Sequence, residues 1–320
     1  MLLLKFVALL PLVSAWGELG HRTVAYLAQK HLTTPAQSWV NDILQGEDIS
    51  TAAIWPDEIK NKTKYGDRYS YSKPWHFYNV KGSFDASCTL NSSDIPAACQ
   101  KNHGCAIEAI ANNTEVAMNK INSNAARAEG LKFVMHIIGD LHQPLHTEAL
   151  ASGGNGICIN WGNARRGEYD DSCKPKNLDN LHAVWDDFIP ETLVQEKYNI
   201  TPDAVSTLRH STKFKDAAKQ WAEKLYDAHD KPEVCSYATA QQCAFNWAQD
   251  SNQLVCRNVL ANGKPSTTED LSKSYYDANK DVVEAQVKRA GLRLAAWINK
   301  MAVASPLLQT QMELKRRVEY

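Results

Sequence analysis

The chain has 320 residues, of which 44% are hydrophobic and 22% charged, so it is long enough to bury one or two full cores. This composition excludes a mainly disordered chain and a collagen-like or low-complexity protein. The 35 Lys and Arg residues nearly balance the 36 Asp and Glu residues, giving a net charge of −1, which argues against a nucleic-acid binder that works through bulk positive charge.

The N-terminus has a pattern typical of a secretory signal peptide. Lys5 precedes an apolar stretch at 6–13, and small residues up to Ala15 form a cleavage site. The apolar stretch is too short for a membrane anchor, which takes about 20 residues. We therefore expect residues 1–15 to be removed, the mature chain to begin at Trp16, and the product to be secreted without a membrane anchor.

Along the mature chain, apolar residues recur at three- and four-residue spacing, which predicts a mainly α-helical fold. In chain order, we expect helices at 23–31, 106–125, 130–138, 214–227 and 281–303. Segments rich in Gly, Ser, Asn and Cys predict loops at 81–104, 151–180 and 230–243. Because no repeat or linker separates domains, we expect one all-α domain over 16–305. The charged tail at 306–320 is either a solvated helix end or an interaction tail.

Cysteines and glycosylation sequons indicate an extracellular compartment. The even number of cysteines, without Cys-x-x-Cys pairs, favours disulfides over a cysteine-ligated zinc site. Four Asn-x-Ser/Thr sequons favour a glycosylated protein. The cysteines are Cys88, Cys99, Cys105, Cys158, Cys173, Cys235, Cys243 and Cys256, and the sequon asparagines are Asn61, Asn91, Asn112 and Asn199.

The spacing of histidine and aspartate is the most informative pattern in the sequence. His136 and Asp140 stand four residues apart within an apolar run, so a helix places them on one buried face, and His182 and Asp186 repeat this spacing. Burying a carboxylate is costly unless it is paired or bound to a cation. One such pair could be a hydrogen-bonded core pair, but two pairs favour a metal site.

Other His and Asp residues beside large rings strengthen this interpretation. His146 follows the first pair closely, Asp57 follows a Trp-Pro pair, and His76 lies between Trp75 and Phe77. Imidazole and carboxylate without thiolate are the ligand set of a hydrolytic zinc site. The spacing therefore predicts a multinuclear metal centre.

At these positions the sequence resembles the S1/P1 family of zinc-dependent single-strand nucleases, whose fold is shared with bacterial zinc phospholipase C. The resemblance spans residues 16 to about 303. It rests, in the family's order, on Trp16-Gly17-Glu18-Leu19-Gly20-His21, Asp57, His76-Phe77, His136 with Asp140, His146 after Gln143-Pro144-Leu145, Gly153-Gly154-Asn155-Gly156, and Asn180-Leu181-His182 with Asp186. It implies a mainly helical domain of the phospholipase C/P1 nuclease type with long loops tied by disulfides.

The resemblance implies three Zn2+ ions. One would be held by Asp57, His76, His136 and Asp140, a second by His146, His182 and Asp186, and the third by His21, Asp140, and the free α-amine and carbonyl oxygen of Trp16. Removal of the signal peptide is then required for activity, because the amide nitrogen of an uncleaved Trp16 is not a zinc ligand.

Catalytic roles follow from the same resemblance. Asp140 would bridge two zincs that generate a hydroxide near neutral pH to attack phosphorus. Asp57 would also orient the attacking water, and Lys60 would stabilise the transition state. A solvated surface lysine is the other interpretation of Lys60. His142, between Asp140 and His146, either supports a ligand or is merely packed.

Substrate contacts are implied at Phe77 and a glycine-rich loop. Phe77 would stack a base, which favours single strands because duplex bases are already stacked. Gly154 and Asn155 belong to the loop that would contact the base edge. Asn79 stands where the family often has an aspartate that reads the base. Because an amide both donates and accepts hydrogen bonds, this difference leaves the base preference of the chain undetermined.

The implied activity is that of a secreted endonuclease that hydrolyses single-stranded DNA and RNA to 5'-phosphate products and also acts on nucleotides as a 3'-nucleotidase. No obligate protein partner is evident. A zinc phospholipase C is the second interpretation, although that group has a glutamate where this chain has Asp186. A secreted zinc-binding helical protein without activity is the third, and it predicts zinc sites closed by protein ligands.

The expected disulfide pattern combines loop size with the resemblance. Three pairs would close local loops, Cys99–Cys105, Cys158–Cys173 and Cys235–Cys243. The resemblance supports pairing the remaining Cys88 and Cys256, because residues 247–251 look like the family's C-terminal helix that ties back to the loop after His76.

Overall fold

The computed structural model describes residues 16–80, 84, 88–101, 104–162, 173, 178–201, 212–235 and 238–318. The expected signal peptide lies outside these residues. The α-helices are α1 (Glu18–Lys30), α2 (Thr34–Leu44), α3 (Ile49–Glu58), α4 (Lys62–Tyr65), α5 (Ile95–Lys101), α6 (Ala106–Met118), α7 (Asn124–Asp140), α8 (Leu181–Ala183), α9 (Ile189–Tyr198), α10 (Thr212–Leu225), α11 (Ala240–Leu254) and α12 (Ser274–Val318).

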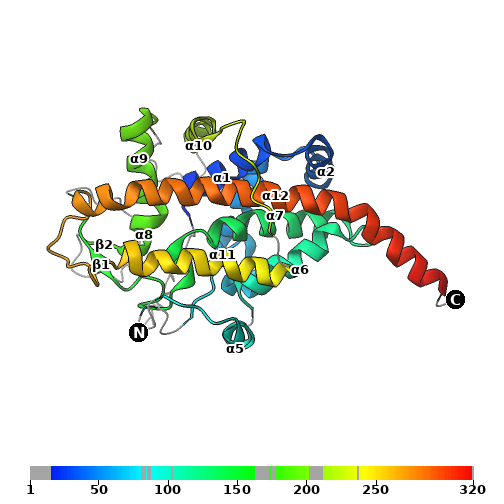
Figure 1. Ribbon diagram of the computed structural model, residues 1–320, viewed down its shortest axis with the longest axis horizontal. Coiled ribbons are helices and arrows are strands. Elements are labelled where there is room, and N and C mark those ends of the chain that lie inside the picture. Colours follow the sequence, from blue (N-terminus) through cyan, green and yellow to red (C-terminus); the bar gives the residue numbers. More distant parts are fainter. Residues whose placement is uncertain are drawn as a thin grey trace, which may run out of the picture.

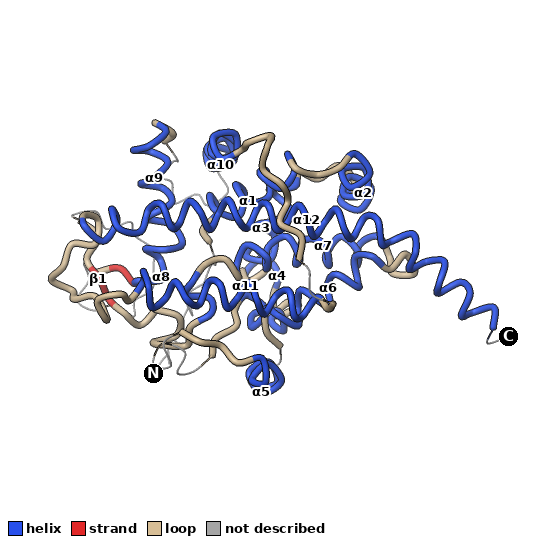
Figure 2. Tube along the Cα trace, viewed as in Figure 1, coloured by secondary structure: helices blue, strands red, loops and turns tan. Residues whose placement is uncertain are grey.

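Short 3-10 and π-helical segments connect these helices. They are η1 (Ser70–His76), η2 (Ser92–Asp94), η3 (Pro144–Thr147), η4 (Val184–Phe188) and η5 (Val255–Val259). Within the described ranges the only sheet is an antiparallel pair of two-residue strands, β1 (Cys158–Ile159) and β2 (Asp179–Asn180), which lies at one end of the molecule (Figure 2). The all-α fold predicted from hydrophobic periodicity is therefore confirmed.

Helices α1, α7 and α12 form the centre of the molecule. α1 packs against α3, α10 and α12, while α7 packs against α3, α6 and α12. α12 runs along the length of the molecule, and its C-terminal end projects beyond the other helices (Figure 1). Residues 306–318 of the expected charged tail continue this helix. None of the helices in the described part of the chain is both long and apolar enough to cross a membrane.

Local sequence explains where α3 and α7, two helices that carry residues of the site, begin. Ser123 caps α7, because its hydroxyl accepts a hydrogen bond from the backbone N–H of Ala126 at 3.2 Å. Asp48 caps α3 by accepting from the N–H groups of Ser50 and Thr51 at 3.0 and 3.1 Å. Both caps satisfy donors that have no partner inside the helix, and they fix the register of the side chains that follow.

The helix expected at 106–125 is confirmed up to Met118 and wrong beyond it. α6 ends at Met118, and α7 begins at Asn124, well before the expected start at 130. Between them, the side chain of Asn119 accepts from the N–H of Ile121 at 2.9 Å, which stabilises a turn in place of a further helical turn. The expected loops are also partly helical, since 81–104 contains η2 and α5 and 230–243 contains the start of α11.

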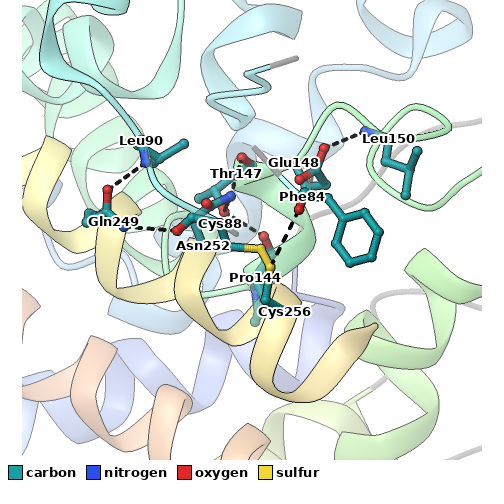
Figure 3. The surroundings of a disulfide bond; sticks show 10 residues. All are labelled: Phe84, Cys88, Leu90, Pro144, Thr147, Glu148, Leu150, Gln249, Asn252 and Cys256. Atoms are coloured by element: carbon teal, nitrogen blue, oxygen red, sulfur yellow. Dashed lines mark hydrogen bonds between the residues drawn. A yellow bond between two sulfur atoms is a disulfide. The ribbon is translucent and has the colours of Figure 1, made fainter. Parts of the chain in front are cut away.

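Four disulfides tie the loops to this frame: Cys88–Cys256, Cys99–Cys105, Cys158–Cys173 and Cys235–Cys243. This is the pairing that loop size and the family resemblance imply. Figure 3 shows the long-range bridge, which joins the segment after His76 to the helical segment η5 that follows α11. Beside it, Gln249 donates to the carbonyl of Cys88 at 3.2 Å, so hydrogen bonds reinforce the link.

Candidate metal centre

Eight His and Asp side chains from seven elements meet at the N-terminal end of α1 and the C-terminal end of α7. They are His21 on α1, Asp57 on α3, His76 on η1, His136 and Asp140 on α7, His146 on η3, His182 on α8 and Asp186 on η4. All are buried except Asp57, whose side chain is 19% exposed. The structure thus brings together every side chain that the sequence assigned to the metals.

The first group surrounds Asp140. One carboxylate oxygen, Oδ1, lies 3.1 Å from Nε2 of His21 and 3.4 Å from Nε2 of His136, while Oδ2 lies 3.1 Å from Nδ1 of His76. Asp57 Oδ1 lies 3.4 Å from Nε2 of His136 and 3.6 Å from Nδ1 of His76. His136 therefore faces both carboxylates and belongs to two triads, one with His21 and Asp140 and one with Asp57 and His76. In each triad the possible ligand atoms lie within 4.8 Å of one another.

The second group consists of His146, His182 and Asp186. Nε2 of His146 lies 3.2 Å from Nε2 of His182, which in turn lies 3.1 Å from Oδ2 of Asp186. The other carboxylate oxygen of Asp186 accepts a 2.6 Å hydrogen bond from Nε2 of Gln143. The two groups adjoin, because Nδ1 of His146 lies 2.6 Å from the carbonyl oxygen of His76.

Backbone carbonyls fix the orientation of three imidazoles. Nδ1 of His136 lies 2.7 Å from the carbonyl of Ala53, and Nδ1 of His182 lies 2.6 Å from that of Gly153; His146 makes the matching bond described above. A carbonyl can only accept, so Nδ1 donates in each ring and the neutral imidazole presents an Nε2 lone pair to the group. Such carbonyl partners commonly orient metal-ligating histidines.

The spacing of these lone pairs fits a tetrahedral cation. With both rings neutral, the Nε2 lone pairs of His146 and His182 face each other across 3.2 Å, an arrangement that is repulsive unless a cation lies between them. Two nitrogen atoms about 2.05 Å from a tetrahedral zinc ion are about 3.3 Å apart. The distances between ligand atoms in this group are therefore those that zinc coordination requires.

The first group contains buried polar atoms that lack hydrogen bonds. Within the described part of the chain, neither oxygen of Asp140, neither ring nitrogen of His21, nor Nε2 of His76 has a hydrogen-bond partner. Buried polar groups are nearly always satisfied, and leaving one unsatisfied costs about 1–3 kcal/mol. A bound cation would satisfy several of these atoms at once, so the donor set fits metal ions here as well.

Burial pushes these groups toward their neutral forms. It lowers the pKa of His21, His76 and His146 well below the ordinary histidine value. Burial, followed by the nearby charge of Asp57, raises the pKa of Asp140 well above the ordinary aspartate value. Metal binding at such a group requires deprotonated carboxylates, so it would release protons.

Burial acts on the carboxylate of the second group in the same way. It raises the pKa of Asp186 to about 7, against the opposing effects of His182 and Gln143. The π-helical segment η4, a type of irregularity that is common at functional sites, carries this residue. Trp185, in the same segment, donates to the hydroxyl of Tyr275 at 2.8 Å, which fixes the segment to α12.

The first described residues, Trp16 and Gly17, pack directly onto this site. Trp16 is fully buried, and Gly17 donates its N–H to the carbonyl of Asp186 at 2.9 Å. A Cβ atom added to Gly17 would lie 1.7 Å from the Asp187 carboxylate, and one added to Gly139 would lie 2.9 Å from Nδ1 of His21. Glycine at these positions lets the start of the chain approach η4, through Gly17, and the end of α7, through Gly139.

Lys60 is not a solvated surface lysine. Its side chain is only 8% exposed, and Nζ lies 2.6 Å from Oδ1 of Asp57. Burial alone would raise the pKa of Asp57, but the Lys60 ammonium, together with His136 and His76, holds that pKa well below the ordinary value. The Lys60 ammonium group therefore lies at the edge of the first group.

The expected substrate residues flank the centre. Phe77 is half-buried directly after His76, and the side-chain oxygen of Asn79 is buried without a hydrogen-bond partner in the described structure. Gly154 has a φ of +83°, a conformation that favours glycine. Asn155 is half-buried and donates from Nδ2 to Ser152 within its own loop at 2.8 Å.

Two residues near the centre received no role from the sequence. Gln143 holds Asp186 with its amide nitrogen and accepts from the N–H of Leu145 with its oxygen, both at 2.6 Å. Gly153 supplies the carbonyl that orients His182. Both residues belong to segments that carry the family resemblance, and this was the sequence feature that could have identified them.

His142 is packed away from the metal centre. Its Nδ1 lies 2.6 Å from the carbonyl of Ile138, and its Nε2 lies 3.1 Å from a guanidinium nitrogen of Arg293 on α12. Burial, followed by the charge of Arg293, lowers the pKa of His142. Of the two interpretations of this residue, the structure favours packing.

An all-helical fold with two adjoining buried groups of His and Asp side chains that could bind metal defines the class of this protein. The family model described as S1/P1 nuclease matches residues 16–303. The chain therefore belongs to the S1/P1 nuclease family.

Curated relatives cover almost the whole chain. Nuclease S1 of Aspergillus oryzae is 34% identical over 310 residues, covering 92% of this chain and 95% of the relative. Nuclease P1 of Penicillium citrinum is 33% identical over 292 residues, covering 89% and 97%. Endonuclease 5 of Arabidopsis thaliana is 29% identical over 309 residues, covering 92% of both chains.

Proposed function

We propose that this protein is a secreted, zinc-dependent endonuclease that hydrolyses single-stranded DNA and RNA to 5'-phosphate products and also acts as a 3'-nucleotidase. The observation that carries the zinc requirement is the spacing of ligand atoms around His182, whose Nε2 lies 3.2 Å from His146 and 3.1 Å from Asp186. Membership of the S1/P1 nuclease family and relatives named nuclease S1 and nuclease P1 support the reaction.

Three zinc ions would be held by the ligand sets that the family resemblance implies. The sets are Asp57, His76, His136 and Asp140; His146, His182 and Asp186; and His21, Asp140, and the α-amine and carbonyl oxygen of Trp16. Bound zinc supplies a Lewis acid that lowers the pKa of water and neutralises phosphate charge. The burial of Trp16 against the site supports a role for the processed N-terminus.

The chain's own residues then position the reacting groups. Asp57 is the most exposed carboxylate of the two groups and can orient the attacking water by accepting a hydrogen bond from it. Lys60 carries its positive charge to the same place, where negative charge increases as the phosphate is attacked. Three imidazoles held by backbone carbonyls keep the site rigid, which reduces reorganisation during the reaction.

Single-strand preference would come from Phe77. Its half-buried ring beside His76 can stack one unpaired base, whereas a duplex base must first be extruded. Asn79 offers a buried amide oxygen without a partner, which suits a base donor. Gly154 and Asn155 would contact the base edge from the facing loop.

Secretion is supported by features that suit an oxidising compartment. Four disulfides are formed, and all four sequon asparagines, Asn61, Asn91, Asn112 and Asn199, are exposed. Exposure is what glycosylation of these side chains requires. The expected cleavage after Ala15 would then complete the metal centre during export.

One assay tests the proposed function. The purified mature protein is given single-stranded nucleic acid, double-stranded nucleic acid and phosphatidylcholine, each with and without chelator. We expect cleavage of the single strands only, abolished by chelator together with a fall in thermal stability, because eight side chains from distant segments share the metals. Hydrolysis of phosphatidylcholine would support the phospholipase alternative, and zinc binding without any hydrolysis would support the non-enzymatic one.

Phe77→Ala should raise KM on single strands and dinucleotides by about fivefold or more, the effect of losing 1–3 kcal/mol of stacking, while zinc content stays near that of the wild type. Phe77→Tyr keeps the ring and is the matched control, so it should restore KM. If Phe77→Ala loses zinc instead, the ring packs the ligand His76 and does not bind the base.

A further inference from the structure

The segment between Lys60 and His76, two residues that lie at the metal centre, is rich in positive charge. Over 60–73 it carries five cationic side chains and one acid, Asp67, in a protein whose net charge is −1. Four of these cations, Lys62, Lys64, Arg68 and Lys73, are exposed. Lys62 pairs with Asp67 at 2.7 Å, but Lys64 and Arg68 are 4.0 Å from their acidic neighbours and are only weakly neutralised.

Aromatic rings alternate with these cations. Lys64 lies over the ring of Tyr65 at 4.9 Å, and Arg68 lies over the ring of Tyr69 at 5.0 Å. Tyr71 is 51% exposed, so its ring is accessible to a base. Cations over rings and exposed rings between cations are the combination with which proteins bind single-stranded nucleic acid.

The exposed ring is anchored to the helix that carries two metal ligands. Tyr71 packs edge-on against Trp75 at 5.2 Å, and Trp75 packs edge-on against Phe133 of α7 at 4.9 Å. Tyr71 and His76 belong to the same 3-10 segment, η1, so five residues separate them by about 10 Å. A stacked strand advances about 3.4 Å per nucleotide, so this distance is about three nucleotides.

We propose that the exposed side chains of Lys64, Arg68, Tyr71 and Lys73, here called the basic aromatic surface, bind single-stranded nucleic acid about three nucleotides away from the bond being cleaved. This inference rests on the proposed function, because the strand is the same substrate. Tyr71 stacks a base, and the cations contact the neighbouring phosphates. A dinucleotide is too short to reach the surface, whereas an oligonucleotide of twelve residues covers it.

The test compares a dinucleotide with a single-stranded 12-mer. Tyr71→Ala should raise KM for the 12-mer by about fivefold or more, with kcat unchanged and dinucleotide hydrolysis unaffected. The double variant Lys64→Ala/Arg68→Ala should reduce the slope of log KM against log salt concentration by about 1.4, because each lost cation removes about 0.7 for a single strand.

Matched controls come from a distant part of the surface. Tyr226 is another exposed tyrosine with a lysine, Lys30, over its ring at 5.0 Å, and it contacts His31, ten residues along α1 from His21. Tyr226→Ala and the exposed double variant Lys219→Ala/Lys224→Ala should behave like the wild type on both substrates. N-linked sugar is removed enzymatically before the assay, because the Asn61 sequon lies next to the surface.

The outcomes separate this inference from the proposed function. A wild-type protein that hydrolyses both substrates, with the same KM for the 12-mer in wild type and Tyr71→Ala, overturns the basic aromatic surface alone. A wild-type protein that hydrolyses neither overturns the proposed function. In that case, binding of a labelled 12-mer, measured by fluorescence anisotropy, tests the basic aromatic surface. Equally tight binding by Tyr71→Ala and the wild type would overturn it.

Discussion

Asp140→Asn is expected to reduce kcat/KM on dinucleotides by about a thousandfold or more, and to cost more activity than His21→Ala. Both Asp140 oxygens face imidazole nitrogens, Oδ1 toward His21 and His136 and Oδ2 toward His76. Asparagine replaces one of these oxygens with an N–H donor that cannot bind a cation. In the proposed ligand sets, Asp140 serves two metal ions and His21 only one, so losing the Asp140 carboxylate should cost more activity.

The measurement combines kinetics with metal analysis of the same samples. Asp140→Asn should contain fewer zinc ions per chain than His21→Ala. Asp250→Asn is the matched control, because Asp250 pairs with Arg293 outside the two groups and should keep its zinc. The opposite ranking of Asp140→Asn and His21→Ala, with metal content measured, would contradict the assignment of Asp140 as the bridge.

Helical spacing predicts part of the candidate metal centre, and the family resemblance supplies the rest of the proposed ligand set. A helical repeat forces His136 and Asp140 onto one face, and a buried carboxylate has few explanations other than a cation. The same periodicity cannot show where a helix is interrupted by a local hydrogen bond, as at Asn119, or where a helix widens into a π-helical turn, as at Trp185. Those features depend on side-chain hydrogen bonds that hydrophobic spacing does not encode.

The orientation of the ligands is also beyond sequence reasoning. The carbonyls of Ala53, His76 and Gly153 decide which imidazole nitrogen faces the site, and each comes from a segment distant in sequence from the ring it holds. Net charge misleads in a related way. A total of −1 argues against bulk positive charge, yet residues 60–73 alone carry five cations and one acid. Averages over the chain hide such local concentrations.

Replacing Cys88 and Cys256 together by serine is expected to lower the free energy of unfolding by about 5 kcal/mol and the Tm by about 10 °C or more. The bridge spans 168 residues, so in the entropic model it restricts the unfolded chain far more than a short loop does. In the folded state, Gln249 still binds the carbonyl of Cys88 at 3.2 Å. Activity at 25 °C should therefore stay close to that of the wild type.

The short bridge Cys99–Cys105, with a separation of only six residues, provides the matched control. Removing it should cost about 2 kcal/mol by the same model. Thermal and denaturant unfolding of both double variants measure this difference, and zinc analysis shows whether the metal centre is intact. Equal losses of stability would contradict the loop-length explanation. Loss of zinc from the long-range variant would instead mean that the bridge holds His146 in place, through the hydrogen bond from Asn252 to Thr147 that lies beside it (Figure 3).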